Sequence, residues 1–301
     1  MIRDRSLAFG TLAAFVSFLL WGLLPFYWKG LEGVPALEVL GHRVFWSALL
    51  LAVLVPLIQR RELREAFRSP KALLLAAGAG LLVGANWFVY NYSVASNRLV
   101  EASLGYYINP LVSIALGVVV LKERLSKMQV AALVLAAVAV VLLSLRVGRF
   151  PWISLTLAIS FGLYGLIKKT NILNSLVSLL IELVVLAPVA LGYLVFLTRQ
   201  GDAAFAAGNL RHTMLLAGAG IATVTPLLLF GAGARRIPLS RVGFLQYLAP
   251  TLMLLIGTLI YNEAFTWIHA VSFALIWIAL AIYMTTILRG ARADRPAKVD
   301  L

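Results

Sequence analysis

Long runs of apolar residues constrain this 301-residue chain more than any other feature. A helix that crosses a membrane needs about 20 mostly apolar residues, because the hydrocarbon core of a bilayer is about 30 Å thick. Ten runs of roughly this length occur, separated by short polar or Pro- and Gly-bearing links: 7–28, 36–58, 72–94, 100–121, 129–147, 151–168, 175–198, 213–234, 240–262 and 268–288. The sequence therefore predicts an all-α integral membrane protein with ten transmembrane helices.

The composition supports a membrane protein and excludes several other classes. Hydrophobic residues make up 62% of the chain and charged residues 13%, about half the ~25% charged residues of a soluble domain. Because cysteine is absent, disulfides, thiolate nucleophiles and cysteine-bound zinc are excluded. The chain also lacks the H-E-x-x-H, G-x-S-x-G, S-x-x-K and Walker-type patterns. We therefore expect no enzymatic activity, no metal site and no cofactor.

The basic residues are distributed unevenly over the links between the apolar runs. If both termini lie on one side, 19 of the 26 Lys and Arg residues fall on that side, six fall on the other, and Arg43 lies within a run. Cytoplasmic loops of membrane proteins carry the excess of Lys and Arg. This bias predicts a multi-pass protein with both termini in the cytoplasm. The net charge of +14 is then an orientation signal, so no nucleic-acid partner is expected, and membrane lipid is the expected environment.

An internal repeat appears when the sequence is shifted by 140 residues. The matching positions keep one register without a gap: Gly22 with Gly162, 77–80 with 217–220, Tyr107 with Tyr247, Pro110 with Pro250, Gly117 with Gly257, and Glu123 with Glu263. Each half holds five runs, an odd number, so the second half must cross the membrane in the opposite sense. We predict two inverted repeats, 1–144 and 145–288, followed by a cytoplasmic tail, 289–301.

Inverted repeats of this kind are a recurrent plan of secondary transporters, whose two halves surround one central site. The pattern favours a transporter that moves a small-molecule substrate by alternating access. No ATP site is visible, so a coupling proton or another gradient would supply the energy. Two alternatives remain at this level, a passive small-solute channel and a non-transporting membrane scaffold or receptor.

Polar residues inside the runs indicate where a central cavity would lie, because polar groups that face lipid are costly. Several of them recur at helical spacing on one face of a run. The alternative is that they form hydrogen bonds between packed helices. The residues expected to line the substrate path are Asn86, Tyr90, Tyr106, Asn109, Tyr164, Gln246 and Tyr247.

Charged residues at the start of the second run suggest a second site. Glu38 and His42 are four residues apart and share a helix face, whereas Arg43 lies about 100° around the helix from His42. Carboxylates and histidines carry protons in pumps and exchangers. The three residues are a hypothetical gate or proton-handling group. The alternative is a structural network, or side chains that extend to the nearby membrane interface.

Three prolines lie inside predicted helices, at Pro110, Pro226 and Pro250. Each removes a backbone hydrogen bond and leaves a carbonyl unpaired one turn earlier. The match of Pro110 with Pro250 suggests hinges, and the alternative is simple kinks.

Several blocks of sequence resemble the RarD-like branch of the EamA group, within the drug/metabolite transporter (DMT) superfamily. The blocks are Glu38-x-x-x-His42-Arg43-x-x-Trp46-Ser47, Asn86-Trp-Phe-Val-Tyr90, Glu101-Ala-Ser-Leu-Gly-Tyr-Tyr-Ile-Asn-Pro110, Ser160-Phe-Gly-Leu-Tyr-Gly165 and Leu239-Ser-x-x-Gly-x-Leu-Gln-Tyr-x-Ala-Pro250. The resemblance implies a bacterial inner-membrane protein with ten helices in two EamA repeats. It also implies a cavity formed by the first, third, fourth, sixth, eighth and ninth helices, and export or exchange of a small organic solute or drug.

Overall fold

The computed structural model describes residues 2–96, 98–144, 150–260 and 267–293. Within these ranges all regular secondary structure is α-helical, which confirms the all-α part of the predicted fold class. The helices are α1 (Ile2–Lys29), α2 (Ala36–Ile58), α3 (Arg60–Ala66), α4 (Pro70–Ala95), α5 (Leu99–Val119), α6 (Lys127–Ser144), α7 (Trp152–Thr170), α8 (Ser175–Gln200), α9 (Leu210–Arg236), α10 (Leu239–Gln246), α11 (Leu248–Leu259) and α12 (Trp267–Ala293). The predicted runs fall on these helices, the ninth run is divided between α10 and α11, and α3 is an additional short helix.

Seven helical segments in the described part of the chain are long and apolar enough to cross a membrane. They are Asp4–Lys29, Ala36–Ile58, Pro70–Ser93, Glu101–Val119, Ser175–Gln200, Leu210–Arg236 and Leu239–Ile256. The apolar parts of α6 and α12, Lys127–Leu142 and Ala270–Thr286, are shorter. α7 carries Lys168 and Lys169 in its last turn. The predicted count of ten spans therefore goes beyond these seven.

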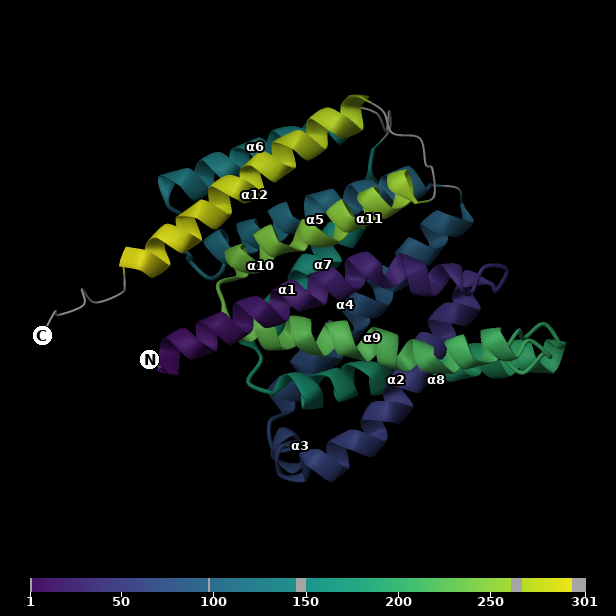
Figure 1. Ribbon diagram of the computed structural model, residues 1–301. Coiled ribbons are helices and arrows are strands. Elements are labelled where there is room, and N and C mark those ends of the chain that lie inside the picture. The colour runs from purple at the N-terminus through teal and green to yellow at the C-terminus, as the bar shows by residue number, and fades with distance from the viewer. Residues whose placement is uncertain (1, 97, 145–149, 261–266, 294–301) are drawn as a thin grey trace, which may run out of the picture.

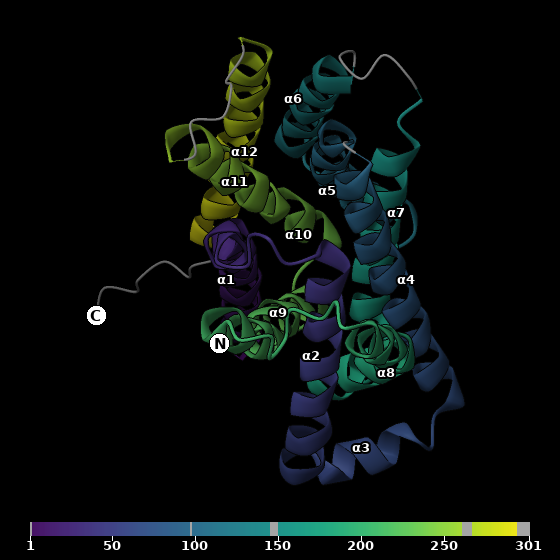
Figure 2. The same cartoon turned by 90° about the vertical axis from the view of Figure 1, so that its right-hand side faces the viewer.

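α1, α8 and α9 run across Figure 1 in roughly the same direction and are seen nearly end-on in Figure 2, whereas α2 and α4 cross them steeply. α1 begins and α12 ends at the same end of the bundle, on the left of Figure 1. The α1–α2 and α8–α9 connections lie at the opposite end, whereas the α9–α10 connection returns to the first. Two residue sets named in the sequence analysis, Glu263 and 294–301, lie outside the described residues.

Helices from the two halves of the chain alternate in space. α1 packs on α9 and α11, and α7 packs on α4 and α5. α2 contacts α8 and α9, α4 contacts α8, and α5 contacts α10. α6 and α12 pack on each other at the edge of the bundle. The core therefore lies between the two halves, and neither half forms a separate body.

Small residues let these helices approach closely. A Cβ atom placed on Gly80 of α4 would lie 2.6 Å from the backbone oxygen of Glu182 in α8. A Cβ atom placed on Gly220 of α9 would lie 2.7 Å from the backbone carbon of Trp46 in α2. Small residues at helix contacts are typical of membrane proteins, where close packing replaces the hydrophobic effect.

Local sequence explains where several helices begin and end. The side chains of Asn174 and Asn209 accept backbone hydrogen bonds at the starts of α8 and α9, as helix-capping residues do. Gly201 adopts a φ of 77° at the end of α8. Pro250 cannot donate a hydrogen bond to the carbonyl of Gln246, and the chain breaks there into α10 and α11.

Candidate functional site

A cavity of about 600 Å³ lies among α1, α2, α4, α5, α7, α9, α10 and α11. This volume falls in the range of roughly 300–1,000 Å³ that is usual for small-molecule sites. Its lining extends from buried Phe18 to exposed Lys29 and Ala36. The cavity therefore reaches the surface near the α1–α2 connection, at the right-hand end of the bundle in Figure 1.

Five of the seven predicted path residues line this cavity: Asn86, Tyr90, Tyr106, Asn109 and Gln246. They come from α4, α5 and α10, so the fold brings together polar groups from both halves. The ring centroids of Tyr90 and Tyr106 are 5.9 Å apart. These residues supply amide and phenol groups to one space.

The amides of the lining differ in how they are paired. The Asn86 Nδ2 donates to the carbonyl of Leu157 at 2.8 Å and to the Ser160 hydroxyl at 2.9 Å. Among the described residues, the buried oxygens Asn109 Oδ1 and Gln246 Oε1 have no hydrogen-bond partner. Buried polar atoms are nearly always paired. The fold therefore leaves these two amide oxygens of lining residues unpaired.

Tyr164 and Tyr247, the other two predicted path residues, lie outside the cavity lining. Tyr164 is fully buried, stacks on Phe230 at 5.7 Å between ring centroids, and donates its hydroxyl to Glu182 Oε2 at 3.0 Å. Tyr247 is fully buried in an apolar cluster that includes Phe273. Tyr164 sits on α7 and Tyr247 at the junction of α10 and α11, next to the cavity, but their side chains face other neighbours.

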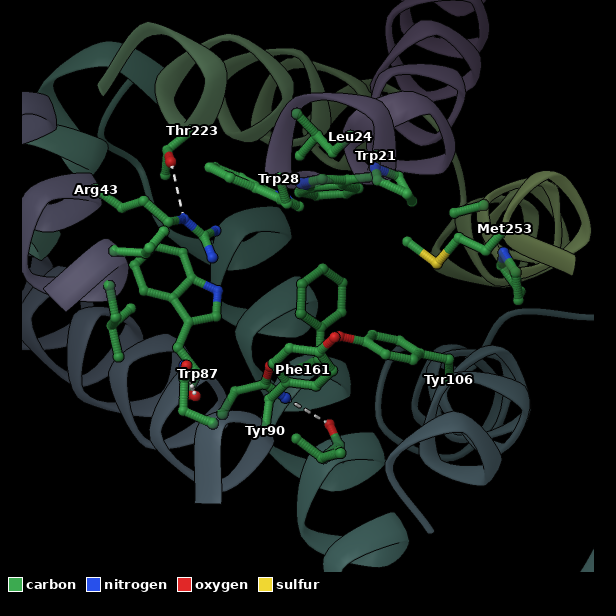
Figure 3. A pocket seen from close by; sticks show the side chains of 18 of the residues that line it. Trp21, Leu24, Trp28, Arg43, Trp87, Tyr90, Tyr106, Phe161, Thr223 and Met253 are labelled. Carbon is green, nitrogen blue, oxygen red and sulfur yellow. Dashed lines mark hydrogen bonds between the residues drawn. The ribbon is translucent and has the colours of Figure 1, made fainter. Parts of the chain in front are cut away.

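Arg43 extends into the cavity between two indole rings, as Figure 3 shows. Its guanidinium carbon lies 4.9 Å from the ring centroid of Trp28 and 4.9 Å from that of Trp87. Its Nε donates to the hydroxyl of Thr223 at 3.1 Å. Among the described residues, no carboxylate forms an ion pair with Arg43 and no Asp or Glu lines the cavity. Arg43 thus places a positive charge beside aromatic rings.

Glu38 and His42 face away from the cavity and hold the α8–α9 connection. Glu38 Oε1 accepts hydrogen bonds from the backbone nitrogens of Ala204 at 2.8 Å and Phe205 at 3.1 Å. The His42 ring lies 4.8 Å from the Phe205 ring, and His42 Nε2 is 3.9 Å from Glu38 Oε1. His42 Nδ1 accepts from Trp46 Nε1 at 3.2 Å. The predicted three-residue group is therefore divided, with only Arg43 in the cavity.

Aromatic rings close the other end of the cavity. Phe18, Trp21, Phe161, Tyr164 and Phe230 contact one another, with ring centroids 5.2–5.9 Å apart. Aromatic pairs at these distances stabilise beyond the area that they bury. This aromatic cluster separates the cavity from the end of the bundle where α1 begins.

A buried ion pair lies beyond the aromatic cluster. Lys168 Nζ is 2.6 Å from Glu182 Oε1, and both side chains are almost fully buried. The Ser178 hydroxyl donates to the same carboxylate oxygen at 2.6 Å, and Tyr164 donates to the other. The sequence analysis did not predict this network. Lys168 and Glu182 each lie within or at the end of an apolar run, so pairing the few intramembrane charges could have found it.

The three prolines occupy different environments. Pro250 lines the cavity one turn after the break between α10 and α11. Pro110 stays inside the continuous helix α5, and its carbonyl lies 2.8 Å from the Cβ position of Gly243. Pro226 stays inside α9, and its carbonyl accepts from the Ser17 hydroxyl at 2.9 Å. Only Pro250 is at a helix break.

The tryptophans and phenylalanines that line the cavity were not predicted from the sequence. Polar residues stand out within apolar runs, whereas an aromatic residue facing a cavity looks the same in the sequence as one facing lipid or the core. The missed lining residues include Trp21, Trp28, Trp87 and Phe161, together with Thr223. No group of three or more His, Asp or Glu side chains that could hold a metal ion occurs among the described residues.

Comparison with known proteins places the chain among bacterial membrane transporters. Residues 8–145 match the sequence model of the EamA-like transporter family. "Uncharacterized transporter YojE" of Bacillus subtilis is 43% identical over 291 residues, which cover 95% of this chain and 97% of that protein. "Protein RarD" of Streptomyces exfoliatus is 45% identical over 95% of this chain and 91% of its own length. "Protein RarD" of Escherichia coli is 39% identical over 91% of this chain and 93% of its own length.

The fold is also similar to that of a solved crystal structure. That structure superposes with a TM-score of 0.70 and covers 92% of this chain and 98% of its own, at 22% sequence identity. At this identity the likeness concerns the fold alone.

Proposed function

Because this chain belongs to the EamA-like transporter family as a RarD-type member, we propose that it exports or exchanges a small organic solute across the bacterial inner membrane. The mechanism that we propose is secondary active transport by alternating access, in which the solute site opens to one side of the membrane at a time. The observation that carries the proposal is the cavity of about 600 Å³ between the two halves of the chain. Its polar and aromatic lining is suited to a small organic molecule.

The pattern of helix contacts supports two inverted repeats. The repeat pairs α1 with α7, α2 with α8, α4 with α9, α5 with the α10–α11 pair, and α6 with α12. When each helix is replaced by its counterpart, the principal helix contacts become contacts that the structure also contains. The contact of α1 with α9 becomes that of α7 with α4, and the contact of α1 with α11 becomes that of α7 with α5. The pairs α2–α8 and α6–α12 each map onto themselves. Two halves related in this way can form equivalent inward-open and outward-open states around one site.

The two ends of the cavity support alternating access. The cavity reaches the surface at the end that holds the α1–α2 connection, and the aromatic cluster and the Lys168–Glu182 pair fill the other end. The repeat register aligns Leu24 and Trp28, which line the open cavity, with Tyr164 and Lys168, which lie in the closed end. In the opposite state we expect Tyr164 and Lys168 to border the open cavity, which gives the predicted path residue Tyr164 a role.

The distribution of basic residues supports the orientation. The end of the bundle where α1 begins and α12 ends carries most of the Lys and Arg residues of the links. The positive-inside rule then assigns this end to the cytoplasm. With that orientation the cavity in this structure opens toward the periplasm.

Flux measurements on the purified protein in proteoliposomes test the proposal. A panel of labelled organic solutes is measured with and without a pH gradient, and with unlabelled solute on the opposite side. The flux of labelled solute is expected to accelerate when unlabelled solute is present on the opposite side. A site that alternates between the two sides can carry unlabelled solute back as it returns, and so exchanges one solute molecule for another. Flux that never shows exchange would identify a passive channel, and no flux of any solute would indicate a scaffold or receptor.

A further inference from the structure

We propose that the solute of this site is an organic anion with a flat apolar body, which binds with its oxyanion on Arg43 and its apolar part among the aromatic rings. This inference rests on the proposed transport function and adds the chemical class of the substrate.

The cavity holds the positive charge of Arg43. A guanidinium carries a positive charge at neutral pH, and a charge inside a membrane protein is costly unless it is compensated. In the part of the chain that the structure describes, the lining contains no Asp or Glu and Arg43 has no carboxylate partner. The second charged lining residue, Lys29, pairs with Glu32 at 3.0 Å near the surface. Arg43 therefore leaves one positive charge in the cavity for a ligand to neutralise.

The guanidinium of Arg43 is held in a geometry that suits an oxyanion. Its Nε is occupied by the Thr223 hydroxyl at 3.1 Å, and the two indoles hold the guanidinium from either side at 4.9 Å. The group points into the cavity in Figure 3, so the N–H groups at its tip face the open space. A planar guanidinium held in this way binds carboxylate or other oxyanions through two parallel hydrogen bonds.

Aromatic rings surround the charge of Arg43. Trp21, Phe161, Tyr90 and Tyr106 face the same space as Arg43 (Figure 3). Aromatic rings bind flat apolar groups by burying them and by offset or edge-to-face contacts. The phenols add hydrogen-bond donors near the proposed anion position. A small inorganic anion would leave most of this aromatic surface unused, so an anion with an aromatic or similarly flat body fits better.

Direct binding tests this inference without requiring transport. The full-length protein in nanodiscs is titrated by calorimetry with three aromatic carboxylates, phenylacetate, cinnamate and indoleacetate, and with the neutral amide of each. Phenethylamine serves as the cationic probe and acetate as the anion without a ring. We expect at least one aromatic carboxylate to bind about tenfold or more tightly than its amide, phenethylamine or acetate, since a charge-assisted bidentate contact distinguishes it.

Substitutions at and near Arg43 then assign the preference to this residue. Arg43→Gln should lower the affinity for the carboxylate to that for its amide. Arg43→Lys should keep a reduced preference, because Lys is a point charge without the planar fork. Thr223→Val should weaken carboxylate binding to a smaller extent, since it removes only the Nε contact. Arg61→Gln removes the same charge from an exposed ion pair in α3 and should leave binding unchanged.

The outcomes separate this inference from the transport proposal. The inference is overturned if no carboxylate binds more tightly than its amide, or if Arg43→Gln keeps the full preference. If Arg43→Gln does not fold, the test rests on Arg43→Lys and Thr223→Val. The inference is then overturned if both variants keep the wild-type preference for the carboxylate over its amide. Flux of neutral or cationic solutes alone would overturn it while the transport proposal stands. Selective carboxylate binding with no flux would support it while refuting transport.

Discussion

A Cβ atom placed on Gly22 of α1 would lie 2.7 Å from the Cβ of Leu252 in α11. The corresponding contact of the second half joins α7 to α5, where a Cβ on Gly162 would lie 2.7 Å from Val112 Cγ1. Both residues of one contact are 140 positions from those of the other, which is the shift of the sequence repeat. The two halves therefore use equivalent close contacts between helices that surround the cavity.

Substitution of these glycines should loosen both contacts. We expect Gly22→Ala and Gly162→Ala each to destabilise the protein by about 1–3 kcal/mol, because an added methyl group forces the packed helices apart. Thermal unfolding in detergent measures the effect. Gly78→Ala is the matched control, because nothing lies within 4 Å of its Cβ position. Equal midpoints for all three variants would show that the close contacts do not constrain the helices.

Two amides of the cavity should respond differently to removal. Asn86→Ala deletes two buried hydrogen bonds, to Leu157 and Ser160, and should reduce stability by about 1–3 kcal/mol. Gln246→Ala removes an oxygen that has no partner among the described residues, so it should reduce solute flux while the unfolding temperature stays near wild type. Parallel unfolding and flux measurements check this. Normal flux in Gln246→Ala would exclude Gln246 from the solute path.

The Lys168–Glu182 pair should stabilise the closed end of the cavity as a unit. Removing one partner leaves a buried charge unpaired, so Lys168→Met or Glu182→Leu should each cost about 3–5 kcal/mol. The double variant should cost less than the sum, and a double-mutant cycle of unfolding free energies measures the difference. The exposed pair Arg61–Glu65 in α3 is the control, for which little or no coupling is expected because solvent screens exposed charges. Additive effects at Lys168 and Glu182 would contradict the coupling.

Glu38 should anchor the α8–α9 connection. Glu38→Ala removes the acceptor for the backbone N–H groups of Ala204 and Phe205, so hydrogen exchange at these two amides should accelerate. Glu38→Gln keeps an acceptor oxygen, so the amides of Ala204 and Phe205 should exchange more slowly in Glu38→Gln than in Glu38→Ala. If Glu38 carried the coupling proton instead, Glu38→Gln would abolish the dependence of flux on the pH gradient, whereas an anchoring role predicts that this dependence persists.

The sequence predicts the helices of this fold well, because each apolar run must satisfy its backbone hydrogen bonds internally in a membrane. It also predicts five of the residues around the cavity, since polar side chains on one helix face avoid lipid. Helical spacing does not reveal which neighbouring helix a face meets. Tyr164 is for this reason directed to Glu182 rather than to the cavity, and the indoles of Trp28 and Trp87 around Arg43 depend on the packing of α1 and α4.

The central claim is that two inverted halves open one cavity to opposite sides in turn. Because the chain has no native cysteine, single-cysteine variants at Leu24 and at its repeat counterpart Tyr164 test it directly. A membrane-impermeant thiol reagent is applied to either face of oriented vesicles, before and after addition of a solute identified by the flux assay. We expect Leu24→Cys to react from outside in the absence of solute, when Tyr164→Cys is protected. During transport, Tyr164→Cys should become reactive from the cytoplasmic side as Leu24→Cys becomes less so. Reactivity of both positions from either side at once, or accessibility that transport never changes, would contradict the account.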